Sequence, residues 1–178
     1  IDVIVTDHHE VSGEMAGAVA VVNPMLETAE GPYRHLAGVG VAFKLCHAVI
    51  KQGLKENYPG VKNVDLKDFL DLVAVGTIAD VVTLKGENRT LAKHGLSRLN
   101  KSPSMGLKAL CEAAGLKGGG VSSHDVGFVI GPRLNAGGRL DSAEAAMKLL
   151  LTDDEEEAAE IAEELDLLNR ERIETGDA

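Results

Sequence analysis

The sequence predicts an α/β fold with a parallel sheet, and three observations support this prediction. Two short β-branched runs, residues 2–6 ("DVIVT") and 18–24 ("AVAVVNP"), are typical of strands buried on both faces of a parallel sheet. Most of the later chain has apolar residues at helical spacing. The 178 residues are 44% hydrophobic and 26% charged, which is enough for one globular domain with its own core.

The predicted helices follow the second strand. In residues 36–51, the apolar side chains Val39, Phe43, Cys46 and Ile50 share one face. Further helices are predicted at residues 66–82, 87–100, 104–114 and 144–151. A glycine-rich turn is expected at 116–121, a helix start at 122–125, and a loop after Ile130.

The terminal segment predicts a solvated helix that connects to another domain. Thr152 and Glu155 have the spacing of a capping box, and only a narrow apolar stripe, Ile161, Leu165 and Leu168, follows. Residues 153–178 hold 12 acidic residues and two arginines, so they account for the whole net charge of -10. The preceding body is neutral and supplies no broad basic face for nucleic acid.

Composition narrows the class of protein further. Aromatic residues make up only 3% of the chain and Trp is absent, which leaves few side chains for stacking on bases. The sequence has no run of 18 apolar residues, so it predicts no membrane span. The distant Cys46 and Cys111 suit two reduced, buried thiols, and hence a cytoplasmic protein, better than a disulfide framework.

The stretch "VTDHH" places three ionisable side chains, Asp7, His8 and His9, directly after the first strand. Ligand sites of open α/β sheets lie at such strand ends, and carboxylate with imidazole is a usual ligand set for Mn²⁺, Zn²⁺ or Fe²⁺. Adjacent residues of an extended chain point to opposite sides. One histidine would then bind metal while the other faces substrate. The alternative is a polar turn with a capping aspartate.

Asp80 lies inside the apolar stretch "GTIADVV", where a buried carboxylate needs a partner or a metal. An aspartate that caps the next turn is an equal alternative. The stretch "GVGVAF", residues 38–43, is similar to a dinucleotide-binding fingerprint but lacks its third glycine. The glycines there more simply let the start of a helix pack tightly against the sheet or the site.

The segment "GPRLNAGGRL" predicts a loop that contacts phosphate. Arg133 and Arg139 each present a fork of donors suited to phosphate oxygens, and they flank Asn135 and Gly137. The glycines allow the backbone to approach a ligand closely. The alternative is a surface loop with ordinary arginines.

In this order and spacing, Asp7-His8-His9, "HLAGVGVAFKL", "DLVAVGTIADVVTL" and "GPRLNAGGRLD" resemble the RecJ-type single-strand-specific exonucleases, a branch of the DHH phosphoesterases. The resemblance covers essentially the whole chain. It implies two divalent ions, Mn²⁺ or Mg²⁺, and hydrolysis of single-stranded DNA from the 5′ end in recombination and repair.

The resemblance also implies roles for individual residues. Asp7, His8 and Asp80 would bind metal, with Asp7 either a ligand or an orienting partner, and His9 would face the phosphate. Arg133, Asn135, Gly137 and Arg139 would bind substrate.

The family's early acidic motifs are absent and are expected upstream of Ile1. Residues 1–152 would then be the C-terminal portion of a DHH phosphoesterase domain, and 153–178 an acidic connector helix toward a second domain. We expect the isolated chain to be inactive, or nearly so, on single-stranded DNA with Mn²⁺. We also expect it to self-associate through its exposed sheet edge.

Two other functions are compatible with the shared "DHH" and "AD" segments. One is a phosphoesterase for short oligonucleotides or nucleotide phosphates, and the other is a non-catalytic replication scaffold. The segment "GPRLNAGGR" and the acidic helix favour the exonuclease, and the intact Asp7, His8, His9 and Asp80 argue against a scaffold. The sequence does not identify protein partners.

Overall fold

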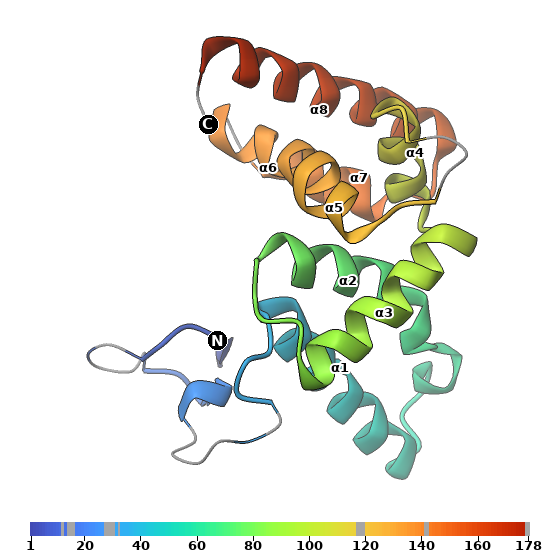
Figure 1. The fold of residues 1–178 in the computed structure, drawn as a ribbon. Coiled ribbons are helices and arrows are strands. Elements are labelled where there is room, and N and C mark those ends of the chain that lie inside the picture. Colours follow the sequence, from blue (N-terminus) through green and yellow to red (C-terminus); the bar gives the residue numbers. More distant parts are fainter. Residues whose placement is uncertain are drawn as a thin grey trace. The chain divides into compact units, whose positions relative to one another are not determined.

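The computed structural model describes residues 1–11, 13, 17–26, 31, 33–116, 120–140 and 143–176, without the side chains of 138–140. It is a mixed α/β fold, mostly helical, with a small parallel sheet (Figure 1). The strands are β1 (Ile4–Thr6) and β2 (Ala20–Val22), and the α-helices are α1 (Gly38–Lys55), α2 (Leu70–Ala79), α3 (Gly86–Lys101), α4 (Met105–Ala113), α5 (Ser123–Asp125), α6 (Gly131–Leu140), α7 (Glu144–Leu151) and α8 (Glu155–Thr175). This confirms the predicted fold class.

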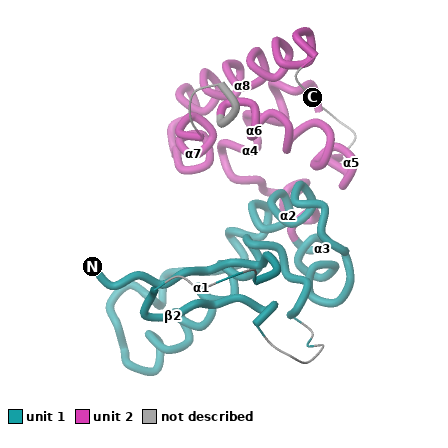
Figure 2. Tube along the Cα trace, turned by 90° about the vertical axis from the view of Figure 1, so that its left-hand side faces the viewer, with its two compact units in different colours: residues 1–94 teal, residues 95–178 magenta. Residues whose placement is uncertain are grey.

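The chain divides into two compact units, residues 1–94 and 95–178 (Figure 2). The division falls within α3, where no feature of the sequence indicated a boundary. The boundary expected at residues 152 and 153 stays a prediction about a longer protein.

The first unit carries the sheet. β1 and β2 pair in parallel with Val5 opposite Val21, and the described part of the chain adds no third strand. The expectation of strands buried on both faces is wrong here, because Ile4 and Val19 are exposed. A strand at the edge of a two-stranded sheet has a neighbour on one side only. Self-association through this edge stays a prediction.

In this unit α1 packs beside the sheet and α2 packs against α1. α1 contacts both β1 and α2, and it begins after the buried residues Leu36 and Ala37. The predicted helix at 66–82 is a 3₁₀ turn, η3 (Leu66–Phe69), followed by α2. α2 buries Val73, Ala74 and Val75 and ends one residue before Asp80. The fold thus brings the end of α2 toward the start of α1.

The second unit is helical. α4, α6 and α7 each pack against α8. The closest approach between α4 and α7 needs a glycine, because a Cβ at Gly106 would lie 1.9 Å from the carbonyl oxygen of Leu149. Leu107, Leu110 and Leu149 fill the core between these helices.

α8 is less solvated than its composition predicts, and its role as a connector to another domain stays a prediction. It buries Ile161 and Leu165 together with the polar Asp166 and Asn169. Its N-cap is Asp154, whose side chain accepts from the backbone N–H of Glu157, so the helix begins two residues later than the predicted capping box. Asp166 pairs with Arg133 of α6 and with Arg170 of α8, and Asn169 accepts from Arg172 of α8 itself; the apolar stripe alone did not reveal these contacts.

The predicted loop after Ile130 is also wrong. The chain runs from α5 through a π-helical turn, η4 (Val126–Ile130), directly into α6. Pro132 has no N–H and would disrupt a regular α-helix. The π turn shifts the hydrogen-bond register just before it, with the Gly131 N–H donating to the Val126 carbonyl. Proline and glycines therefore lie within a helix.

The two cysteines are free but only one is buried. Cys111 lies in the core of the second unit, where burial raises the pKa of its thiol to about 11. Cys46 is exposed on α1, so the prediction of two buried thiols holds only for Cys111. Among the described residues, no helix combines the length and apolarity that a bilayer crossing requires.

Candidate functional site

The candidate site begins where β1 ends. The Asp7 N–H donates to the Val22 carbonyl at 3.1 Å, which keeps Asp7 in line with the sheet. The chain then bends, because Asp7 Oδ1 accepts from the backbone N–H groups of His8 at 2.7 Å and His9 at 3.2 Å. Asp7 therefore forms the capped polar turn that was one of the two expectations for it.

This turn changes the relation between the two histidines. His9 Nδ1 donates to Asp7 Oδ1 at 2.7 Å, and the His8 and His9 rings lie with their centroids 4.3 Å apart. The expectation that the two side chains point to opposite sides is wrong, because the chain is bent rather than extended at this position. The His9 side chain is 76% exposed, whereas that of His8 is only 16% exposed.

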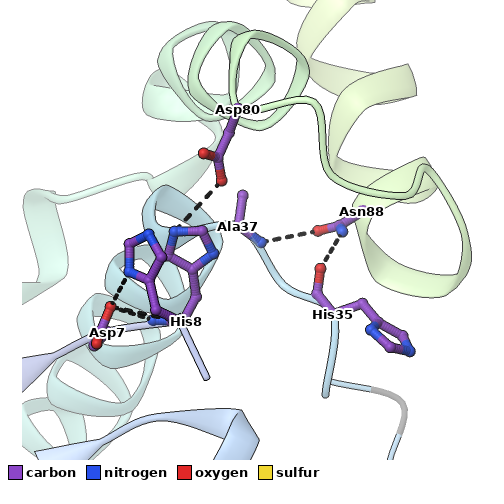
Figure 3. Close-up of polar contacts among 7 residues, drawn as sticks. Asp7, His8, His35, Ala37, Asp80 and Asn88 are labelled. Atoms are coloured by element: carbon purple, nitrogen blue, oxygen red, sulfur yellow. Dashed lines mark hydrogen bonds and ion pairs between the residues drawn. The ribbon is translucent and has the colours of Figure 1, made fainter. Parts of the chain in front are cut away.

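His8 points toward the end of α2 (Figure 3). Its Nε2 lies 3.5 Å from Asp80 Oδ2, so the predicted convergence of His8 and Asp80 is confirmed. Asp80 itself is not buried as its apolar neighbours suggested, since 38% of its side chain is exposed. It occupies the C-cap of α2, where the helix ends and the side chain reaches solvent.

Gly38 makes room for the His8 ring at the start of α1. A Cβ at this position would lie 3.1 Å from His8 Cδ2, which is tighter than an ordinary contact. This agrees with the expectation that the glycines of residues 38–43 allow close packing against the site.

We expect Gly38→Ala to leave stability unchanged or raise it slightly, because alanine favours a helix over glycine by up to about 1 kcal/mol. The added methyl group should push the His8 ring away from Asp80 and weaken the binding of a divalent ion at this position. A metal titration of the full-length protein measures this. Gly17→Ala, with nothing within 4 Å of its Cβ, is the control; an equal metal response in both variants would contradict the packing role.

Asn88 holds the surroundings of the site and was missed by sequence reasoning. Its side chain is buried, and its Nδ2 donates to the carbonyls of His35 at 2.5 Å and Thr83 at 3.1 Å. Its Oδ1 accepts from Ala37 N–H at 3.4 Å. It thus joins the chain before α1 to the turn after Asp80 (Figure 3). An asparagine in a polar helical stretch carries no signal of this role.

Val81, which follows the C-cap of α2, has a strained backbone conformation. Its φ of 58° is in the left-handed region, which a β-branched residue rarely adopts. Such strain costs about 1–3 kcal/mol and is found disproportionately at functional sites. The turn directs the chain away immediately after Asp80.

The Asp7 turn has an electrostatic consequence. The hydrogen bond from the His9 ring, and then those from the backbone N–H groups of His8 and His9, lower the pKa of Asp7 from 3.8 to about 2. A depressed carboxyl pKa adds stability above the unfolded-state pKa, and this contribution is lost as the pH falls toward 2.

We therefore expect the Asp7 carboxyl carbon to titrate near pH 2 by NMR, and to titrate closer to its ordinary value in His9→Ala. The shift should be upward because the largest cause has been removed. Asp125, whose low pKa comes from Ser122, should be unaffected in the same variant. An unchanged Asp7 midpoint would show that its contact with the His9 ring is not kept in solution.

The geometry of His8 and Asp80 fits a shared metal ion. Two ligands about 2.1 Å from one ion lie about 3.4 Å apart at a tetrahedral angle, close to the 3.5 Å between Nε2 and Oδ2. The described residues bring no third His, Cys, Asp or Glu into such a group. Asp7 faces His9 through Oδ1 instead. The chain therefore presents two candidate ligands side by side, with Asp7 as an orienting partner.

The residues expected to bind substrate lie on α6 in the second unit. Arg133 is engaged within that unit: its Nε and Nη2 donate to Asp166 Oδ1 at 2.8 and 2.7 Å, and its Nη1 donates to the Val129 carbonyl at 2.8 Å. Asn135 is exposed and Gly137 is buried. The Arg139 side chain lies outside the described residues.

Comparison with known proteins gives a family match for the first part of the chain. Residues 1–77 match the model described as "DHH family, N-terminal domain". These residues include the Asp7-His8-His9 turn, so the first part of the chain is similar to this domain.

The particular likeness is to RecJ. The chain is 44% identical over 172 residues to the "Single-stranded-DNA-specific exonuclease RecJ" of Bacillus subtilis, covering 97% of this chain and 20% of that protein. It is 43% identical over 178 residues to the RecJ of Escherichia coli, covering 98% of this chain and 31% of that protein. The chain thus spans about a fifth to a third of the length of these relatives.

Solved structures give the same result. RecJ of Thermus thermophilus in complex with Mn²⁺ matches with a TM-score of 0.80 and 39% identity, covering 97% of this chain and 24% of that chain. An exonuclease RecJ bound to manganese matches with a TM-score of 0.79 and 41% identity, covering 97% of this chain and 41% of that chain.

Proposed function

We propose that the chain is part of a metal-dependent phosphodiesterase that degrades single-stranded DNA from the 5′ end, in recombination and repair. The observation that carries the proposal is the 3.5 Å approach of His8 Nε2 to Asp80 Oδ2 at the end of β1. Its support is the similarity to proteins named as single-stranded-DNA-specific exonucleases and to RecJ structures with Mn²⁺ or Mg²⁺.

In this proposal His8 and Asp80 hold a divalent ion, Mn²⁺ or Mg²⁺, in a two-ion site. Such ions activate water and stabilise the leaving oxygen of a phosphodiester. Asp7 binds the His9 ring and fixes its orientation, as carboxylates do for functional histidines. The exposed His9 ring can then face the scissile phosphate. The complete site needs more ligands than the described residues bring together.

Asn135 and Arg139 are proposed to contact the substrate from α6, whereas Gly137 is buried, which does not support the direct contact expected for it. Arg133 supports this surface from behind, because its donors are directed to Asp166 and to the Val129 carbonyl. A helix rather than a loop therefore presents these residues.

The test uses the full-length protein with a single-stranded oligonucleotide labelled at either end and with the matching duplex. We expect Mn²⁺ or Mg²⁺ to support stepwise release of nucleotides from the 5′ end of the single strand, and EDTA to stop it. The duplex should persist. Hydrolysis confined to oligonucleotides of a few residues would favour the small-substrate phosphoesterase, and absence of metal-dependent hydrolysis would contradict the proposal.

A further inference from the structure

Phe128 is the most exposed Phe or Tyr side chain of the chain, with 73% of its surface open. Its neighbours Val126 and Ile130 are fully buried. Burial normally stabilises a phenylalanine side chain more than a valine side chain. Here the valine is buried and the phenylalanine is exposed, which is the reverse of that preference. Such exceptions to the hydrophobic pattern occur mainly at functional positions.

The π-helical turn η4 is the cause of this arrangement. It directs Val126 and Ile130 into the core and leaves Phe128, midway between them, on the outside. The side chain is nevertheless supported: the His124 ring stacks on it, with centroids 4.7 Å apart and planes at 28°. Beside it, no heavy atom lies within 4 Å of where a Cβ of Gly127 would be.

The surroundings of the ring argue against a protein-docking face. Ser122, Ser123 and His124 on one side and Asn135 further along α6 are exposed and polar, and Val129 is half-buried. Protein interfaces use broad contiguous apolar patches. A single supported aromatic ring among polar groups instead suits a flat, polar-edged ligand.

We propose that the His124–Phe128 pair is a stacking platform for a nucleobase of single-stranded DNA. This inference rests on the proposed function and adds a base-binding site to it. Every base has a π face, so stacking on aromatic side chains holds single strands without regard to sequence. α6 continues directly from η4, so the platform and the exposed Asn135 belong to one helical segment.

The experiment measures binding of a single-stranded oligonucleotide that contains 2-aminopurine to the full-length protein, in EDTA to prevent cleavage. We expect Phe128→Leu, which keeps an apolar side chain, to weaken binding about tenfold, within the range for one base stack. Phe128→Trp should bind at least as tightly as the wild type. Phe69→Leu, at another exposed phenylalanine, should bind normally.

An oligonucleotide with abasic sites separates stacking from other effects. It should bind the wild type more weakly, and Phe128→Leu should weaken it little further. Equal binding of the normal oligonucleotide by wild type and Phe128→Leu would overturn the platform. If Phe128→Leu does not fold, the Phe128→Trp variant provides the test. Weaker binding of the oligonucleotide by Phe128→Trp than by the wild type would overturn the stacking platform. A wild type with no affinity for single strands would instead contradict the proposed function.

Discussion

Asp80→Asn is expected to lower metal-dependent cleavage of single-stranded DNA by about a thousandfold or more in the full-length protein, while the fold survives. The proposal makes Asp80 a direct ligand of a catalytic ion, and the loss of several kcal/mol of transition-state stabilisation has this effect on the rate. Stability should change little, because the side chain is 38% exposed and lies at a helix C-cap.

The control for this variant is Asp153→Asn, which removes an exposed carboxylate with no part in the site. It should cleave like the wild type. Near-normal turnover by Asp80→Asn, measured over a range of Mn²⁺ concentrations and with an unchanged melting temperature, would refute the assignment of Asp80 as a ligand. Loss of both activity and folding would instead give Asp80 a structural role.

Arg133→Ala is expected to lower the free energy of unfolding by about 3 kcal/mol. Arg133 and Asp166 are 14% and 8% exposed, and removing one member of a buried ion pair costs about 3–5 kcal/mol. The lower end applies because Asp166 keeps a second partner, Arg170, whose Nη2 lies 2.6 Å from Oδ2. The melting temperature should fall by about 6–12 °C.

Arg170→Ala is the matched control, since Arg170 contacts the same carboxylate but is 65% exposed. Because the Arg170 side chain is largely solvated and Asp166 keeps Arg133 as a partner, its loss should cost at most about 1 kcal/mol, so this variant should be nearly as stable as the wild type. Thermal unfolding of the two variants side by side measures the difference. If Arg133→Ala has normal stability but binds DNA more weakly, the result would contradict the structural role and support the original prediction that Arg133 contacts phosphate.

The elements with a strong periodic pattern were predictable from sequence. The helices observed as α1, α3, α4 and α7 follow the expected ranges closely. The segment after Ile130 was not predictable, because Pro132 and the glycines normally mark a loop. A π turn accommodates the proline there, and such a turn has no simple sequence signature. The partners that bury Asp166 on α8 likewise come from tertiary packing.

The candidate site was partly predictable. The approach of His8 to Asp80 followed from a strand-end motif and a carboxylate in an apolar stretch. The capped turn at Asp7 was one of two alternatives, but the pattern did not show that this turn brings the two histidine rings together. The role of Asn88 did not follow from the pattern, because its contacts with Ala37 and His35 join residues far apart in sequence. Such contacts depend on the tertiary fold, which residue type alone does not encode.

The most direct test of the shared metal site is a crystal structure of the full-length protein with Mn²⁺, using anomalous scattering to locate the ions. The proposal predicts an anomalous peak about 2.0–2.3 Å from both His8 Nε2 and Asp80 Oδ2. The His9 ring should remain hydrogen-bonded to Asp7. Manganese bound elsewhere, with His8 and Asp80 still facing each other and no ion between them, would contradict it.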